Sequence, residues 1–231
     1  MTQPMALSMT PARTAKLVAN ALSATQVTPI VFVVDDDPSV RQALELLIDS
    51  AGWQPETFGS AMEFLASSHP RSPSCLVLDV SLPEINGLEL QERIMADRAD
   101  MPIIFVTGCG DVPTSVQAMK RGALDFLTKP FRDDVLLDII GRAIEGSRAA
   151  LRHDAELRII RERQALLSRR EREVMALVVA GRLNKQIAGA LGISEITVKA
   201  HRGSMMRKMQ AHSLPHLVTM VASLGADPLA A

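Results

Sequence analysis

The chain has 231 residues, enough for one large domain or two of ordinary size, and 47% of them are hydrophobic. No run approaches about 18 uninterrupted apolar residues, which argues against a membrane span. Two cysteines, Cys75 and Cys109, are too few for a disulfide framework and suit a reducing compartment, so we expect a cytoplasmic protein.

The net charge of −1 conceals a division between two parts of the chain. Residues 30–147 contain 9 Lys/Arg against 19 Asp/Glu, a net charge of −10, whereas residues 165–226 contain 9 against 3, a net charge of +6. An acidic half joined to a basic half suggests a regulatory module tied to a nucleic-acid binder. Chance asymmetry is the alternative.

Residues 1–29 contain no acidic residue, and their few apolar positions follow no firm period. The continuous apolar stretch of a signal peptide is absent, although an acid-poor composition is also typical of organellar transit segments. We expect a disordered N-terminal extension over residues 1–29 and assign it no function.

From residue 30 short apolar runs alternate with segments of helical periodicity. We expect strands at 30–34, 53–58, 75–80, 101–108 and 124–128. We expect helices at 38–52, 60–68, 87–97 and 112–123, and a long one after Pro130. This alternation predicts an α/β domain with a five-stranded, parallel, doubly wound sheet that is covered on both faces. Ligands of such sheets bind beyond the carboxyl ends of the strands.

Polar residues stand at the carboxyl ends of the expected strands. The stretch "VVDDDP" (33–38) continues the first strand into three consecutive acids. Each strand end alone would be an ordinary hydrated acid or turn, but together they form a pocket of carboxylates, one hydroxyl and one ammonium. Its members are Asp35, Asp36 and Asp37 after the first strand, Asp79 on the third, Thr107 on the fourth and Lys129 on the fifth.

Clustered carboxylates repel one another, so a bound cation or full solvation has to offset their charge. Carboxylate oxygens and water are the ligands that Mg²⁺ prefers, and a metal would offset the repulsion among Asp35, Asp36 and Asp79. A carboxylate beside Mg²⁺ can attack phosphorus and form an aspartyl phosphate. The metal, Lys129 and Thr107 would then stabilise the charge of the phosphoryl group. A solvated acidic turn is the alternative.

Residues 30–147 resemble the receiver domain of two-component response regulators. The resemblance rests on "VVDDDP", "LVLDVSLPEINGLEL" and "PIIFVTGCGDVPTSVQAMKRGALDFLTKPF", in this order. It implies that Asp79 accepts the phosphoryl group and that Thr107 and Lys129 bind it. The implied Mg²⁺ ligands are Asp35, Asp36, Asp79 and the backbone carbonyl of Ser81.

The same resemblance implies roles for neighbouring residues. Phe126 would be an aromatic switch residue that acts with Thr107, which is compatible with a plain core phenylalanine. Asp37 would be a solvated neighbour of the metal ligands, and the Lys129–Pro130 bond would be cis. Independently of the resemblance, Cys109 stands two residues after Thr107 and is either a redox-sensitive thiol or, because it lacks a resolving partner, passive.

Helix boundaries are closely spaced in the basic half. "SRRE" (168–171) is a capping box, and its helix would end at Gly181. Asn184 would cap a second helix that ends at Gly192, and Ser194 would cap a third, "EITVKAHRGSMMRKM". Two short helices around a tight turn are typical of a helix-turn-helix motif, in which the later helix enters the major groove of DNA.

The third helix has two different faces. Val198, Met205 and Met209 fall on one stripe that should pack inward. A basic face opposite an apolar stripe suits DNA, since phosphate contacts supply most of the affinity, while an ordinary solvated face is the alternative. The opposite face carries Lys199, Ala200, Gly203 and Arg207, with His201 and Arg202 at its flanks.

The stretch "LSRREREVMALVVAGRLNKQIAGALGISEITVKAHRGSMMRKM" resembles the FixJ/LuxR-type DNA-binding domain. The resemblance implies a small all-α domain of four helices that dimerises on a two-fold related site. Lys199 would carry most of the direct readout, Ala200 would meet a thymine methyl, and DNA shape would contribute. The bases would be met by Lys199, Ala200 and Gly203, and the phosphates by Thr197, Arg202, Arg207 and Lys208. Asn184, Lys185 and His201 complete the expected DNA-binding set.

The segment 132–167 has apolar residues at helical spacing, with Gly141 and Gly146 as its only expected breaks. It predicts one long helix or a helix in two parts, which would transmit rotation, pair as a short coiled coil or act as a passive spacer. The expected domains are a receiver domain over 30–147, a helical linker over 148–165 and a DNA-binding domain over 166–231.

These features predict a transcription factor controlled by phosphorylation. A sensor histidine kinase would phosphorylate Asp79, and the chain would then form a homodimer and bind double-stranded promoter DNA. RNA polymerase would be a further partner, and no membrane would be involved. We expect no enzymatic activity beyond Mg²⁺-dependent self-phosphorylation from a phosphodonor and slow autodephosphorylation.

Two alternative functions remain open. A phosphohydrolase with Asp79 as nucleophile would commonly carry a second acid two residues later, where this chain has Ser81. A constitutive DNA binder with a merely structural receiver domain would not need the complete pocket of carboxylates, hydroxyl and ammonium.

Overall fold

The computed structural model describes residues 28–83, 85–108 and 112–225. The predicted extension, apart from its last two residues, and Cys109 lie outside these ranges. The described residues form two compact units, one within Met1–Leu151 and the other within Arg152–Ala231, which we call the α/β unit and the helical unit. In the described part of the chain, no helix is both long and apolar enough to cross a membrane.

The α/β unit is built on a five-stranded sheet with strand order β2-β1-β3-β4-β5. Every pairing in the sheet is parallel. The strands are β1 (Ile30–Val34), β2 (Gln54–Phe58), β3 (Ser74–Asp79), β4 (Ile103–Thr107) and β5 (Asp125–Thr128). The helices are α2 (Pro38–Ser50), α3 (Ala61–Ala66), α4 (Gly87–Asp97), α5 (Val112–Lys120) and the first part of α6 (Asp133–Ala165). The predicted doubly wound α/β fold is therefore confirmed.

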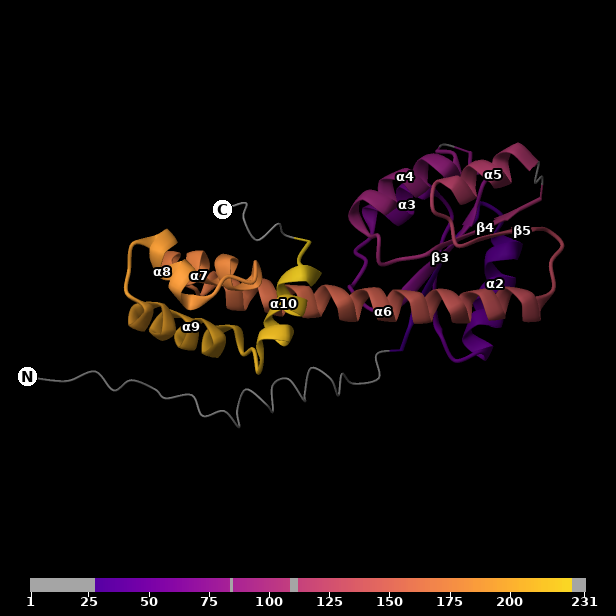
Figure 1. Ribbon diagram of the computed structural model, residues 1–231. Coiled ribbons are helices and arrows are strands. Elements are labelled where there is room, and N and C mark those ends of the chain that lie inside the picture. Colours follow the sequence, from indigo (N-terminus) through magenta and orange to yellow (C-terminus); the bar gives the residue numbers. More distant parts are fainter. Residues whose placement is uncertain (1–27, 84, 109–111, 226–231) are drawn as a thin grey trace, which may run out of the picture. The chain divides into compact units, whose positions relative to one another are not determined.

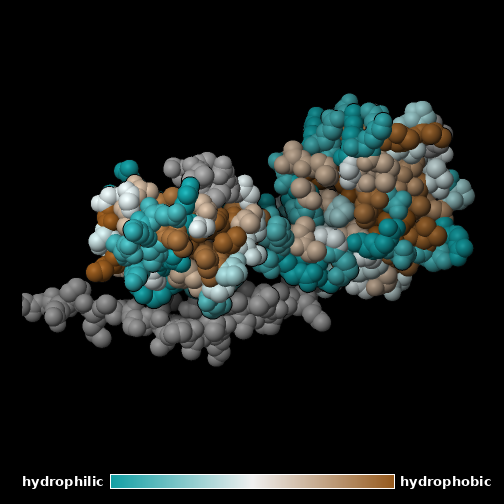
Figure 2. All heavy atoms as spheres, viewed as in Figure 1, coloured by the Kyte–Doolittle hydropathy of each residue, from teal (hydrophilic) through white to brown (hydrophobic). Residues whose placement is uncertain are grey.

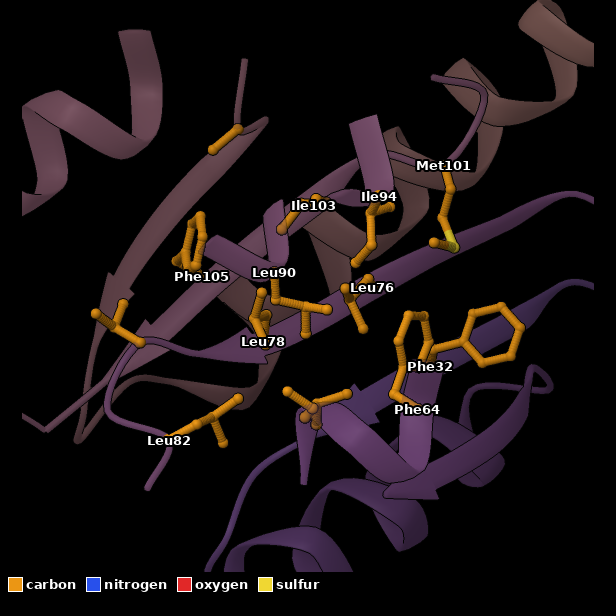
Figure 3. Close-up of a cluster of buried hydrophobic side chains, with 14 of the residues drawn as sticks. Phe32, Phe64, Leu76, Leu78, Leu82, Leu90, Ile94, Met101, Ile103 and Phe105 are labelled. Carbon is orange, nitrogen blue, oxygen red and sulfur yellow. The ribbon is translucent and has the colours of Figure 1, made fainter. Parts of the chain in front are cut away.

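Helices cover both faces of the sheet, which explains why β1, β3 and β4 are buried at every position. Along β1, Phe32 packs with Phe64 of α3 on one face, and Val33 packs with residues of α2 and α6 on the other. In Figure 1, α3, α4 and α5 lie on one side of the sheet, and α2 and the first part of α6 lie on the other. Figure 3 shows the first of these cores, where side chains of the strands interdigitate with Leu90 and Ile94 of α4.

The ends of α2 follow from local chemistry. Asp37 is the N-cap, and its side chain accepts a hydrogen bond from the backbone N–H of Ser39 at 2.8 Å. Pro38 occupies the first helical position, where its missing N–H costs nothing. Gly52 follows the helix with φ +83°, a left-handed conformation that glycine adopts without strain. The predicted start and stop of this helix are therefore both confirmed.

The linker helix α6 runs without interruption over 33 residues, so the first of the two expectations, one long helix, is confirmed, and neither Gly141 nor Gly146 breaks it. Buried residues such as Ile140 and Ile144 flank the two glycines and pack against the sheet. A helical glycine costs only about 1 kcal/mol relative to alanine, and burial of these neighbours outweighs that cost. The division between the two units falls inside this helix, after Leu151.

The helical unit contains the last part of α6 followed by α7 (Arg169–Val179), α8 (Asn184–Leu191), α9 (Glu195–Met209) and α10 (Leu214–Ser223). Val198, Met205 and Met209 are fully buried in its core, as their spacing predicted. On the visible face of this unit, hydrophobic residues lie among hydrophilic ones (Figure 2).

Two of the three predicted helix caps are confirmed, and one is wrong. Ser168 and Glu171 form the expected capping box of α7, and Ser194 caps α9. Asn184, however, is the first residue of α8 rather than its cap. The cap is Leu183, whose backbone is extended and whose N–H donates a hydrogen bond to Gln186 Oε1 at 2.9 Å. Gln186 therefore satisfies one backbone group at this end, while a leucine side chain can satisfy none.

Candidate functional site

Three acidic side chains converge at the carboxyl edge of the sheet. Asp35 follows β1 and is fully buried, Asp79 ends β3 and is 6% exposed, and Asp36 is exposed. One carboxylate oxygen from each of them lies within 4.8 Å of the others. The parallel arrangement of β1 and β3 brings these strand ends together, as the sequence predicted. Three carboxylates so close together supply oxygen donors of the kind that a divalent cation prefers.

Lys129 lies against two of these acids. Its ammonium Nζ donates hydrogen bonds to Asp35 Oδ2 at 2.6 Å and to Asp79 Oδ2 at 2.7 Å. Lys129 is the first residue after β5, and the Lys129–Pro130 peptide bond is cis. The ammonium therefore reaches the acids of β1 and β3 from a strand at the edge of the sheet.

The charges at this edge affect one another. Burial raises the pKa of Asp35, and the hydrogen bond from Lys129 opposes that rise. Burial works against the charged form of Lys129, but hydrogen bonds to Asp35 and Asp79 together raise the pKa of its ammonium. The contact between Lys129 and Asp35 favours the charged form of both groups, which suits a binding site for ions better than an apolar pocket.

The third acid of "VVDDDP" has a different environment. Asp37 is exposed, and hydrogen bonds from the side chain and the backbone of Ser39 lower its pKa. It caps α2 and does not belong to the cluster of Asp35, Asp36 and Asp79. The three consecutive acids therefore occupy three different positions: one buried beside Lys129, one exposed at the cluster, and one at a helix cap.

Two other predicted residues, Thr107 and Ser81, lie at the same edge, and Phe126 lies farther back along β5. Thr107 is fully buried at the end of β4, and its carbonyl accepts a hydrogen bond from the Lys129 backbone at 2.8 Å. The backbone N–H of Ser81 donates a hydrogen bond to Asp79 Oδ1 at 2.8 Å. Phe126 is half-buried, and its ring lies 6.2 Å from that of its cross-strand neighbour Phe105. The sheet thus brings the predicted pocket residues to one place.

Sequence reasoning missed Arg41 of α2. Its guanidinium donates a hydrogen bond to the backbone carbonyl of Asp35 at 2.6 Å and lies beside Gly59. Arg41 therefore holds the chain where β1 turns toward α2, next to the acidic cluster. The sequence signal for this role was the position of Arg41, which lies one turn into the helix that begins directly after the three acids.

Gly87, at the start of α4, was also missed. A Cβ atom at this position would lie only 2.5 Å from the backbone carbonyl oxygen of Asp79 and 3.0 Å from Val80 Cα. The Gly87 N–H also donates a hydrogen bond to the carbonyl of Val80 at 3.1 Å. Glycine allows α4 to approach the end of β3 closely. A glycine in the first turn of a predicted helix, where no turn requires it, was the signal for this contact.

In the helical unit, α9 presents the predicted DNA-binding face. Lys199, Ala200 and Arg207 are exposed on the side opposite the buried stripe of Val198, Met205 and Met209. His201 and Gly203 are partly buried, and Lys185 is exposed on α8. In the described part of the chain, no ion pair or side-chain hydrogen bond engages Lys199 or Arg207. Both cations are therefore available to an anionic partner.

The other predicted DNA-binding side chains have partners within the unit. Arg202 donates a hydrogen bond to Asn184 Oδ1 at 2.7 Å, which joins α9 to the start of α8. The Thr197 hydroxyl lies 2.8 Å from the Ser194 hydroxyl at the cap of α9. Each of these contacts holds an end of a helix-turn-helix element in place.

Lys208 is also engaged within the unit. Its ammonium donates a hydrogen bond to Glu171 Oε2 at 2.6 Å. The same oxygen accepts a hydrogen bond from the Ser168 backbone in the capping box of α7. Sequence reasoning identified the capping box but not its connection to α9, because the two residues are 37 positions apart.

Known protein families match both parts of the chain. Residues 31–141 match the family described as response regulator receiver domain, and residues 165–221 match bacterial regulatory proteins of the luxR family. The chain is 48% identical over 196 residues to nodulation protein W of Bradyrhizobium diazoefficiens, covering 85% of this chain and 86% of that protein. It is 43% identical over 195 residues to the transcriptional regulatory protein FixJ of the same organism, covering 84% and 95%.

Solved structures show the same relationship. The structure of the response regulator StyR matches with a TM-score of 0.75 and 43% sequence identity, covering 85% of this chain and 99% of that one. The similarity thus extends over both units.

Proposed function

Because the chain belongs to the response regulators that join a receiver domain to a LuxR-type DNA-binding domain, we propose that phosphorylation of Asp79 controls its binding to promoter DNA. A sensor histidine kinase would supply the phosphoryl group. The observation that carries the proposal is the contact of Lys129 with both Asp35 and Asp79 beside the exposed Asp36.

Phosphoryl transfer would use groups of this chain directly. A carboxylate oxygen of Asp79 attacks phosphorus and forms a P–O bond while the P–N bond to the kinase histidine breaks, and the electron pair returns to the imidazole nitrogen. The Lys129 ammonium, which lies 2.7 Å from Asp79, would pair with an oxygen of the transferred group. The Thr107 hydroxyl would bind a second oxygen, since Thr107 ends the strand next to β3.

The donor set fits Mg²⁺. Asp35, Asp36 and Asp79 supply hard carboxylate oxygens within 4.8 Å of one another, and the carbonyl of Ser81 would add another oxygen. When bound there, Mg²⁺ would neutralise charge on the phosphoryl oxygens. Asp35 and Lys129 would hold the site in its charged form before the metal and the phosphoryl group arrive.

The absence of a second acid at Ser81 supports slow autodephosphorylation and argues against a phosphohydrolase. Ser81 is exposed, and its backbone N–H is directed at Asp79. A serine hydroxyl at this position is a poor general acid and base, so the aspartyl phosphate would persist long enough to act as a signal.

The second half of the proposal is that phosphorylation drives dimerisation and DNA binding through α9. The exposed cations Lys199 and Arg207, opposite the buried stripe of this helix, support a face for duplex DNA. A dimer would place two such helices on a two-fold related site, and RNA polymerase would be the next partner at a promoter.

One experiment tests the whole proposal. The natural chain and Asp79→Asn are incubated with Mg²⁺ and acetyl phosphate, and sedimentation and DNA binding are measured before and after. We expect a shift toward dimer and tighter DNA binding for the natural chain alone. Equal DNA affinity with and without phosphodonor would instead support a constitutive DNA binder.

A further inference from the structure

Ile196, in the first turn of α9, is the most exposed large apolar side chain among the described residues, at 80%. Packing within the unit does not explain it, because the core side of the helix belongs to Val198, Met205 and Met209. Helix stability does not explain it either, since a β-branched residue is a poorer helix former than alanine. A single exposed apolar residue is ordinary, so a role for Ile196 has to be inferred from the residues around it.

The neighbours of Ile196 along the helix form the predicted DNA-binding face. Lys199 and Ala200 lie three and four positions later, and Gly203 and Arg207 lie seven and eleven positions later. These spacings place all five residues on one stripe of a helix. Arg207 extends along this stripe, since its Nη1 atom would lie 3.8 Å from a Cβ atom at Gly203. Ile196 is therefore the N-terminal, apolar end of a stripe that is otherwise basic or small.

The stripe suits a polyanion better than a protein surface. Lys199 and Arg207 have no ion-pair partner in the described ranges, whereas Arg202 and Lys208, which lie off the stripe, are engaged with Asn184 and Glu171. The small side chains at Ala200 and Gly203 let the helix approach closely. Residues in the N-terminal turns of a recognition helix are those that reach base edges in the major groove.

We propose that Ile196 contacts the C5 methyl group of a thymine in the major groove and so selects a T·A pair at one position of the DNA site. The thymine methyl is the apolar group that bases display in this groove, and an exposed isoleucine matches it. This inference rests on the proposed DNA binding through α9 and adds a specificity-determining residue to it. It shifts methyl recognition from Ala200, where the sequence placed it, to the larger side chain one turn earlier.

The test removes the methyl group alone. Full-length protein with Mg²⁺ and acetyl phosphate selects duplexes from a randomised library, and each thymine of the best duplex is then replaced by uracil. Fluorescence anisotropy compares the natural chain with Ile196→Ala. We expect one position where uracil weakens binding of the natural chain about fourfold, the value of one buried methylene group, and has little effect on Ile196→Ala.

A matched control separates this effect from a general loss of apolar surface. Leu46→Ala removes a side chain that is 67% exposed on α2 of the α/β unit, and this variant should keep the full uracil effect. Thermal unfolding should be unchanged in Ile196→Ala, because the substitution removes no buried contact and alanine favours the helix.

Two results would overturn the inference. If uracil weakens both proteins equally at every position, Ile196 does not contact a methyl group, and a uniform loss of affinity in Ile196→Ala would assign it to the DNA backbone or to a protein partner. If the natural chain selects no sequence at all, the proposed DNA binding itself fails, and the inference fails with it.

Discussion

The ammonium of Lys208, in the last turn of α9, donates a hydrogen bond at 2.6 Å to Glu171, a buried carboxylate in the first turn of α7. The same carboxylate oxygen accepts a hydrogen bond from the Ser168 backbone, so one side chain both caps α7 and joins it to the recognition helix. This contact joins the last turn of α9 to the start of α7. Lys208 therefore contributes to the scaffold as well as to the charge of the predicted DNA face.

The first prediction concerns the stability of the helical unit. The hydrogen bond from Lys208, with others from Ser204 and Ser168, lowers the pKa of Glu171 from 4.5 to about 2. Since the pKa is lowered on folding, the stabilisation is complete above about pH 4.5 and is lost as the pH falls through about 2. Glu171→Gln should lower the free energy of unfolding near pH 7 by about 1 kcal/mol. The difference in stability between this variant and the natural chain should shrink as the pH falls from about 4.5 to about 2.

The measurement is urea unfolding at several pH values. Glu173→Gln is the control in the same helix, because the ion pairs of Glu173 with Arg169 and Arg170 lie at the surface. Its unfolding midpoint should hardly change. A pH-independent loss in Glu171→Gln would show that the charge of Glu171 does not matter and that only its hydrogen bonds do.

The second prediction concerns the phosphoacceptor. Incubation with Mg²⁺ and acetyl phosphate should add one acid-stable, base-labile phosphoryl group to the natural chain. Asp79→Asn should abolish this labelling, because an amide is a poor nucleophile. Asp37→Asn, which makes the same change at the exposed cap of α2, should be labelled normally. Intact mass spectrometry measures both, and labelling of Asp79→Asn at the natural level would refute the assignment.

The third prediction concerns the metal. Asp36→Asn removes one charge from the cluster of Asp35, Asp36 and Asp79 and should weaken Mg²⁺ binding about tenfold or more. Without metal, the loss of repulsion should leave stability unchanged or raise it by up to about 1 kcal/mol. Isothermal titration and thermal unfolding measure the two effects. Unchanged Mg²⁺ affinity would remove Asp36 from the metal site.

The fourth prediction concerns Gly87. A Cβ atom there would meet the Asp79 carbonyl oxygen at 2.5 Å, so Gly87→Ala should push α4 away from β3. We expect a loss of about 1–3 kcal/mol of stability and slower phosphorylation of Asp79. Gly146→Ala is the control, because its Cβ would make only an ordinary contact of 4.0 Å with Pro102. It should be neutral or stabilise α6 by up to about 1 kcal/mol.

The fifth prediction separates base readout from positive charge on α9. Lys199 lies in the first two turns, and Lys199→Ala should cost about 1–3 kcal/mol on the selected duplex but much less on a scrambled one. Arg207 lies two turns later, and Arg207→Ala should weaken both duplexes alike and reduce the salt slope by about one. Fluorescence anisotropy at several salt concentrations measures both. Equal losses for both variants on both duplexes would make α9 a purely electrostatic anchor.

Local sequence pattern was sufficient to predict the helices and strands and to predict which residues form the acidic pocket. The alternation of apolar runs with helical periods predicted the parallel sheet, and its strand ends brought Asp35, Asp79, Thr107 and Lys129 to one edge. Capping chemistry predicted the starts of α7 and α9. These features depend on residues close in the sequence, where side-chain period and backbone hydrogen bonding leave few choices.

Contacts between distant segments were decided only by the tertiary structure. Lys129 meets Asp35 across 94 positions, and Lys208 meets Glu171 across 37, and neither pairing has a local signal. The continuity of α6 through Gly141 and the fit of Gly87 against Asp79 likewise depend on what packs beside each glycine. Sequence by itself determined which groups this protein carries and on which elements, because propensity and periodicity are local. The fold decided which charges face each other, because burial and pairing depend on neighbours that only folding brings together.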